Sequence, residues 1–100
     1  MAKGKEEGVS VCGPWLVGSN YFIRTVTMSL MGKLVAVFPQ ELVLEEASWI
    51  ADTGRFASFL KEGPSSSTEI EPFLKGRVIV GRGAVIDATI WPHALLREQK

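Results

Sequence analysis

Alternation of apolar and polar residues is the clearest pattern in the first half of the chain. Residues 21–31 are rich in β-branched and aromatic types and repeat with a period of two, which predicts one long strand. Two further alternating runs, residues 33–38 and 41–46, lie on either side of Pro39 and Gln40. Two strands around so short an interruption predict a β-hairpin.

Glycine and proline divide the other apolar runs. Gly32 predicts a turn or a strong bend between the first two strands. Residues 70–80 return to a strand pattern that Pro72 and Gly76 interrupt, and residues 84–91 form the last predicted strand.

The segment between the two groups of strands has a different character. Within residues 47–60, Phe56 and Phe59 stand three positions apart, which predicts one or two helical turns. Asp52 or Thr53 is expected to cap this short helix, because both residue types accept hydrogen bonds from the first free amides. A Ser-rich loop follows the predicted helix.

Together these elements predict a mainly β protein. The expected architecture is a small, strongly bent antiparallel barrel of five strands with a short helical insertion. The chain divides into a flexible N-terminal segment (1–18), one barrel domain (19–92) with a helical or loop insertion (47–69), and a C-terminal tail (93–100).

Composition favours an oligomer. Apolar residues make up 46% of the 100 residues and charged residues only 22%. A domain of this size has much surface relative to its volume, so part of the apolar content is expected at an interface between copies. Most soluble oligomers are symmetric homo-oligomers, which makes self-association the natural expectation.

Charge and cysteine content exclude several function classes. Eleven basic and eleven acidic side chains give a net charge of zero, which argues against duplex DNA as a partner. Cys12 is the only cysteine, so an intramolecular disulfide and a cysteine-cluster metal site are excluded. The chain contains no apolar run of signal-peptide or membrane-spanning length, which predicts a cytoplasmic protein without membrane contact.

The stretch VIVGRGAVI contains the most distinctive candidate site. A dinucleotide-binding fingerprint fails here, because Ile86 stands where the third glycine belongs and a strand pattern follows. A short hairpin turn fits better, with positive φ at Gly81 or Gly83. Arg82 would then stand at the apex, where its planar guanidinium is free to meet a phosphate, a carboxylate or a base.

Four further residues are secondary candidates. Arg24 shares an apolar strand face, either as an edge position with a snorkelling side chain or as a ligand or interface contact. Trp49, Asp52 and Arg55 can line a pocket in which the indole stacks on a base and the arginine meets a phosphate. The alternative is a capped turn with Trp49 and Phe56 in the core.

Catalytic constellations are weak throughout the chain. His93 is the only histidine, and nothing supplies an orienting group for a Cys12–His93 pair. Glu41 and Glu45 share a strand face and, with Glu46, fit a solvated surface better than a divalent-ion site. We therefore expect no enzymatic activity, no metal and no cofactor.

The order of these signals resembles the bipartite signature of Sm-like proteins, the Hfq and LSm class. The first motif is matched in its apolar frame by Gly32, Leu34, Val37, Leu42 and Leu44, and the second by Val78, Ile79, Arg82, Gly83 and Ile86. Pro39, Gln40 and Glu41 occupy the turn in which the family carries Asp and Asn. The general texture is also similar to small uncharacterised proteins of phages and prophages.

The resemblance implies a five-stranded barrel that closes a ring by pairing the fourth strand of one subunit with the fifth of the next. The turns at residues 38–41 and 81–83 would converge at the pore. Arg82 and the flanking glycines would contact phosphate, Phe38 would stack, and Gln40 or Glu41 would recognise a base.

Two functions remain open at this point. The first is a non-enzymatic ring that binds RNA or a nucleotide-type ligand, in the host cytoplasm if the chain is phage-encoded. The alternative is a structural or interaction module, such as a phage assembly or host-takeover factor, in which Arg82 only stabilises the ring.

Overall fold

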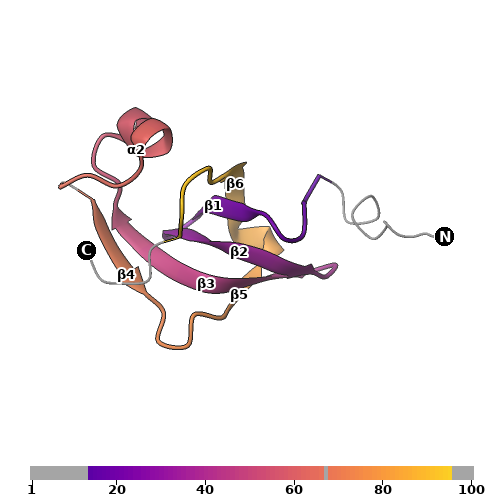
Figure 1. Ribbon diagram of the computed structural model, residues 1–100. Coiled ribbons are helices and arrows are strands. Elements are labelled where there is room, and N and C mark those ends of the chain that lie inside the picture. Colours follow the sequence, from indigo (N-terminus) through magenta and orange to yellow (C-terminus); the bar gives the residue numbers. More distant parts are fainter. Residues whose placement is uncertain (1–13, 67, 96–100) are drawn as a thin grey trace.

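A computed structural model describes residues 14–66 and 68–95 of the chain and confirms a mainly β protein (Figure 1). Six antiparallel strands form one sheet, accompanied by one short α-helix and a 3-10 turn. In chain order the elements are β1 (Asn20–Thr25), β2 (Ser29–Val37), β3 (Glu41–Asp52), α2 (Phe56–Glu62), β4 (Glu69–Pro72), β5 (Val78–Gly81), η1 (Arg82–Ala84) and β6 (Val85–Ile90).

The sheet is open, so the expected closed barrel of five strands is wrong. Its strand order is β4-β3-β2-β1-β6, and β5 also pairs with β3. β5 takes the first part of the outer edge of β3, opposite residues 41–44, and β4 takes the last part, opposite residues 48–52. β5 and β6 do not pair with each other, which leaves each of them with a free edge in the described part of the chain.

A turn divides the segment predicted as one strand over residues 21–31. β1 ends at Thr25 and β2 begins at Ser29. The Thr25 amide donates to the Met28 carbonyl over 2.7 Å, and the Thr25 hydroxyl accepts from the Met28 amide over 3.1 Å. Val26 and Met28 are exposed in this turn, and their apolar side chains continue the strand-like alternation across it.

Gly32 lies within β2 and makes no turn. In the pairing of β2 with β3, Met31 faces Ser48 and Lys33 faces Glu45, so two residues of β3 stand opposite Gly32. This is a β-bulge, and Glu46 adopts a positive φ of 53° in it. A Cβ on Gly32 would lie 3.1 Å from the Leu44 Cβ, so a side chain at this position would crowd β3 at the bulge.

The bulge lets β3 contribute to hydrophobic clusters on both faces of the sheet. Before it, Leu42 and Leu44 point into the first cluster, and after it Ile50 points into the second. The first cluster comprises Tyr21, Ile23, Leu30, Leu34, Leu42, Leu44, Ala47 and Val80. The second comprises Phe22, Met31, Ile50, Phe59, Ile70 and Trp91.

The hairpin and the short helix are confirmed, whereas the helix cap is wrong. β2 and β3 are joined by a tight turn in which the Phe38 amide donates to the Glu41 carbonyl over 2.8 Å. α2 follows Arg55 and has no side-chain cap. Asp52 is the last residue of β3, which therefore runs into the segment expected to be an insertion, and its carboxylate accepts from the Gly54 amide over 2.8 Å.

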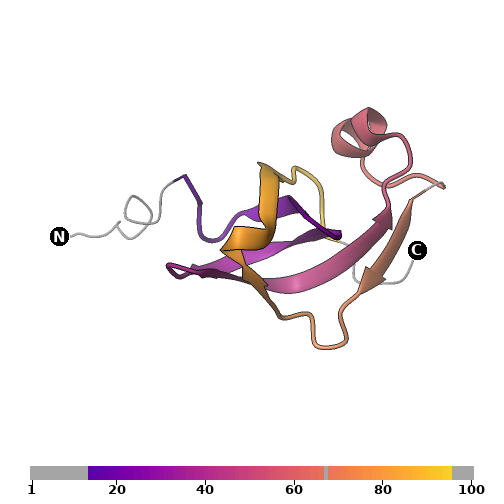
Figure 2. The same ribbon diagram turned by 180° about the vertical axis from the view of Figure 1, so that it is seen from behind.

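Segments at both ends of the described chain pack onto the sheet. The centre of the Trp91 ring lies 4.7 Å from the centre of the Phe59 ring on α2. The backbone amide of Trp91 donates to the Asn20 carbonyl over 2.8 Å. Near the start, the Trp15 ring meets the Tyr21 ring edge-on at 5.1 Å. Figures 1 and 2 show α2 at the end of the sheet where β3 stops, with the β4–β5 connection projecting away from the strands.

Candidate functional site

The two turns that the resemblance places together do meet within one chain. Glu41 pairs with Gly81 where β5 runs along β3, and the Arg82 amide donates to the Gln40 carbonyl over 2.9 Å. We call residues 38–41 and 81–83 the turn cluster. Its convergence follows from the pairing of β5 with β3, which carries η1 to the β2–β3 turn.

The Arg82 side chain is turned back onto its own chain. One guanidinium nitrogen, Nη1, donates to the Phe38 carbonyl over 2.9 Å and to the Pro39 carbonyl over 3.4 Å. Arg82 is half-buried by this arrangement. It therefore acts first as a clamp between η1 and the β2–β3 turn, and the expectation of a free guanidinium at an apex is wrong.

The expected hairpin turn at residues 81–83 is wrong as well. η1 is a 3-10 turn that joins β5 to β6, and these two strands pair with β3 and β1 rather than with each other. Gly81 has a φ of −68°, and Gly83 is not among the positive-φ glycines. Neither glycine therefore adopts the left-handed conformation that a short hairpin turn requires.

The outer side of the turn cluster is exposed. Phe38 is 50% exposed, and the side chains of Gln40 and Glu41 are also open to solvent. An aromatic ring, an amide and a carboxylate beside a half-buried arginine are groups that can stack on a base and bond its edge. The carboxylate of Glu41 would repel a phosphate brought to the same surface.

Arg24 is held by an ion pair across two strands. It stands opposite Asp87 in the pairing of β1 with β6, and its Nε donates to Asp87 Oδ1 over 2.8 Å, with a second contact between Nη2 and Oδ2. The guanidinium also lies over the Phe56 ring, 5.4 Å from its centre. The hydrogen bond from Arg24 lowers the pKa of the Asp87 carboxyl.

Trp49, Asp52 and Arg55, which were predicted to line a pocket, have different local surroundings. Trp49 lies on β3 between its cross-strand neighbours Leu30 and Glu71 and is 38% exposed. The Asp52 carboxylate is bonded to the turn before α2, and Arg55 is exposed at the start of that helix. Asp52 thus orders a turn, whereas the half-exposed Trp49 ring is not the core residue of the capped-turn interpretation.

The structure adds two apolar grooves that the sequence pattern did not reveal. A groove of about 310 Å³ runs beside β5, and another of about 310 Å³ lies beside β6. The first is lined from β5 by Val78, Ile79 and Val80 and from the β1–β2 side by Met28 and Leu30. The second is lined by Pro14, Trp15, Tyr21, Val85, Ile86, Asp87 and Ala88.

The free strand edges are protected very differently. β4 is a four-residue edge strand that carries Glu69, Glu71 and Pro72, the charges and the proline with which proteins prevent edge pairing. β5 has no charged residue, and the single charge of β6, Asp87, is neutralised by Arg24. Ile79 on β5 is 69% exposed, and Ile86 on β6 is 62% exposed. In the sequence, the stretch VIVGRGAVI covers β5 and the start of β6, and its residues are apolar on both faces of these strands.

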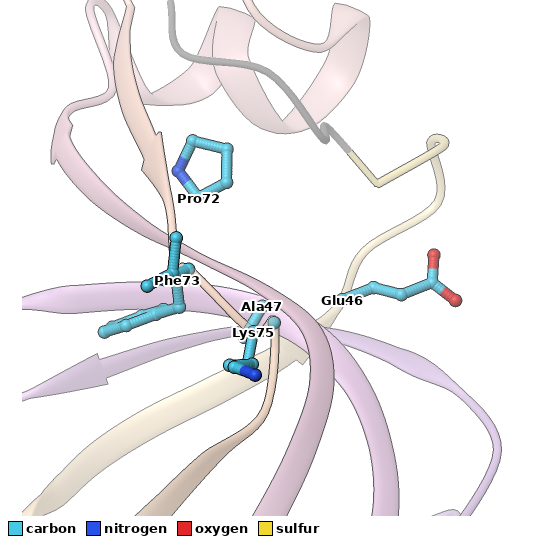
Figure 3. Close-up of a pocket in the computed structure, with 7 residues that line it drawn as sticks. Glu46, Ala47, Pro72, Phe73 and Lys75 are labelled. Carbon is cyan, nitrogen blue, oxygen red and sulfur yellow. The ribbon is translucent and has the colours of Figure 1, made fainter.

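A smaller pocket of about 220 Å³ lies where the bulge of β3 meets the β4–β5 connection. Backbone bonds close its floor, because the Ala47 amide donates to the Gly76 carbonyl and the Phe73 amide to the Ala47 carbonyl. Figure 3 shows the Glu46 carboxylate directed away from Phe73 and Lys75. Two ionisable residues, Glu46 and Lys75, line the pocket, and their charged groups point apart.

The other chemistry-bearing residues are placed apart from the turn cluster. His93 packs against α2, with Nε2 3.0 Å from the Leu60 carbonyl oxygen, while Cys12 lies outside the described residues. Within residues 14–66 and 68–95, no group of three histidine, cysteine or acidic side chains is arranged to hold a metal ion. The same residues include no helix with the length and apolar character needed to cross a membrane.

Comparison with known proteins does not add an assignment. No family model, no curated protein and no solved structure matches this chain.

Proposed function

We propose that this protein is a non-enzymatic interaction module that assembles with copies of itself through the free edges of β5 and β6. The observation that carries the proposal is the contrast between edges in one molecule. β4 carries charges and a proline on its edge, whereas β5 and β6 present edges that no other described strand pairs with, beside exposed isoleucines. An exposed apolar edge of this kind is a liability unless another strand covers it.

A second copy is the partner that accounts for both edges at once. Pairing β5 of one copy with β6 of the next is a head-to-tail contact, which generates a closed ring when the rotation closes. Each contact would also cover the apolar groove beside each strand. A net charge of zero means that copies do not repel one another through their overall charge. This is the arrangement that the Sm-like resemblance implies.

Charged substitutions on the two edges test the proposal. Ile79→Lys and Ile86→Lys place an ammonium group on β5 and on β6, respectively, and we expect either variant to shift the protein to the monomer. Leu74→Lys is the matched control, because Leu74 is 97% exposed on the β4–β5 connection and belongs to neither edge. Light scattering and native mass spectrometry report the result. A monomeric wild-type protein at tens of micromolar, or edge variants that assemble like wild type, would refute the proposal.

Binding of single-stranded RNA or a nucleotide at the turn cluster is the second candidate function. The exposed Phe38 ring beside Arg82 favours it. Phe38→Ala separates stacking from the clamp, because the clamp bonds the main-chain carbonyls of Phe38 and Pro39 and not the Phe38 ring. Loss of one stacked base costs about 1–3 kcal/mol, so titration of a short RNA or a cyclic nucleotide should show at least about fivefold weaker binding. Equal affinity in the variant would remove Phe38 from the site.

A further inference from the structure

Gly81 and Gly83 stand at positions where the fold of a single chain does not require glycine. A Cβ built on either residue meets nothing within 4 Å, and neither has a positive φ. The contrast with other glycines of the chain is clear. Gly32 is crowded by Leu44 and Ala47, and Gly76 has a φ of 75°.

The two glycines do not serve as a hinge either. η1 is bonded at both of its ends, to the β2–β3 turn through the Arg82 amide and guanidinium, and to the β1–β2 turn through the Ala84 carbonyl, which accepts from the Val26 amide over 3.0 Å. Glycine in such a fixed segment loses more conformational entropy on folding than alanine would. Glycine on either side of Arg82 therefore lowers the stability of the single chain, and no contact or backbone conformation within that chain requires it.

We infer that Gly81 and Gly83 are contact positions at which the backbone of a second copy passes close to η1. Besides bulges and tight bends, glycine at a strand position marks places where a ligand or another backbone approaches closely. Gly81 is the last residue of β5, whose free edge we assign to self-assembly, so Gly81 and the adjoining η1 lie directly at the end of that contact. The inference rests on the proposed function and adds the residues that set how closely the copies approach.

Alanine and leucine substitutions at the two glycines test this directly. In the Ile79→Lys background, where assembly does not contribute, Gly81→Ala and Gly83→Ala should leave the thermal midpoint unchanged or raise it by about 2–6 °C. In the otherwise wild-type chain the same changes should weaken assembly at least about fivefold, because overpacking a contact costs on the order of 1–3 kcal/mol. Gly83→Leu should weaken it further. Ala57→Leu, on the exposed face of α2, controls for added apolar bulk.

Sedimentation velocity over a dilution series separates the outcomes. Assembly that is weakened by the glycine variants and unaffected by Ala57→Leu supports the inference. Glycine variants that assemble as tightly as wild type would overturn it while the proposed function stands. A wild-type protein that is monomeric throughout would overturn both. A lowered midpoint in the Ile79→Lys background would show that the fold itself needs these glycines, which also overturns the inference.

Discussion

At the scale of single residues, Gly32 is a position where one added carbon atom would meet crowded neighbours. A Cβ there would lie 3.1 Å from the Leu44 Cβ and 3.2 Å from the Ala47 Cα, and both neighbours are buried in the first hydrophobic cluster. Gly32→Ala should therefore destabilise the protein by about 1–3 kcal/mol in urea unfolding. Gly81→Ala, with open space around its Cβ, serves as the matched control, and both changes are compared in the Ile79→Lys background, where assembly does not contribute. Equal stability of the two variants would contradict the bulge geometry.

Arg82 is expected to contribute to the stability of the fold. Its guanidinium joins η1 to the β2–β3 turn through the Phe38 and Pro39 carbonyls. Arg82→Ala should lower the free energy of unfolding by about 1 kcal/mol, the typical worth of such a bond. Arg82→Lys should recover part of that loss, because an ammonium group also donates to a carbonyl. Full stability of Arg82→Ala in denaturant titrations would show that the clamp contributes nothing.

Asp87 gives the protein a predictable response to acid. The hydrogen bond from Arg24 lowers the pKa of its carboxyl in the folded state, so the folded protein binds this proton less readily than the unfolded chain does. The stabilisation is therefore complete above the unfolded pKa of about 3.9 and is lost as pH falls through the lower folded pKa. Asp87→Asn should remove this part of the acid dependence below about pH 4. Identical stability–pH profiles for the two proteins would contradict this assignment.

At the scale of elements, the alternation of apolar and polar residues predicted the strands whose side chains face the two clusters. It did not predict the turn after β1 or the bulge in β3, where the backbone departs from regular strand pairing. The hairpin of β2 and β3 follows from the alternating runs on either side of Pro39. The turn at Thr25 was hidden because the apolar Val26 and Met28 continue the pattern through it. The bulge was hidden because it places Glu46, rather than a glycine, at positive φ.

α2 should depend on the segment that follows β6. Nε2 of His93 lies 3.0 Å from the carbonyl of Leu60, at the C-terminal end of the helix, and Trp91 packs against Phe59. Loss of the hydrogen bond in His93→Ala should raise hydrogen exchange in α2 while β2 and β3 stay protected. His93→Gln retains a donor and should exchange more slowly than His93→Ala. Equal protection in all three proteins would show that the helix does not rely on this bond.

At the scale of the whole molecule, the sequence led to the turn cluster but not to the edges. The convergence of residues 38–41 with 81–83 was expected from the Sm-like resemblance, and the hydrogen bond between Arg82 and Gln40 places these turns together in one chain. Which strands end with a free edge depends on the pairing order of all six strands. Local patterns carry no information on that order, so the contrast between β4 and the β5 and β6 edges needed the structure.

The response of assembly to salt follows from the chemistry of these edges. The strands that we assign to self-association present backbone groups and exposed isoleucines, and the only charge on them is already paired within the chain. Salt screens charges but does not weaken apolar burial, so assembly should be unchanged or slightly stronger in 1 M NaCl than in 0.1 M. RNA binding at the turn cluster would instead weaken, by about fivefold over this range for the one phosphate contact that Arg82 can supply. Sedimentation and titration across this range distinguish the two functions, and assembly that dissociates in high salt would show that charged residues outside β5 and β6 hold the copies together.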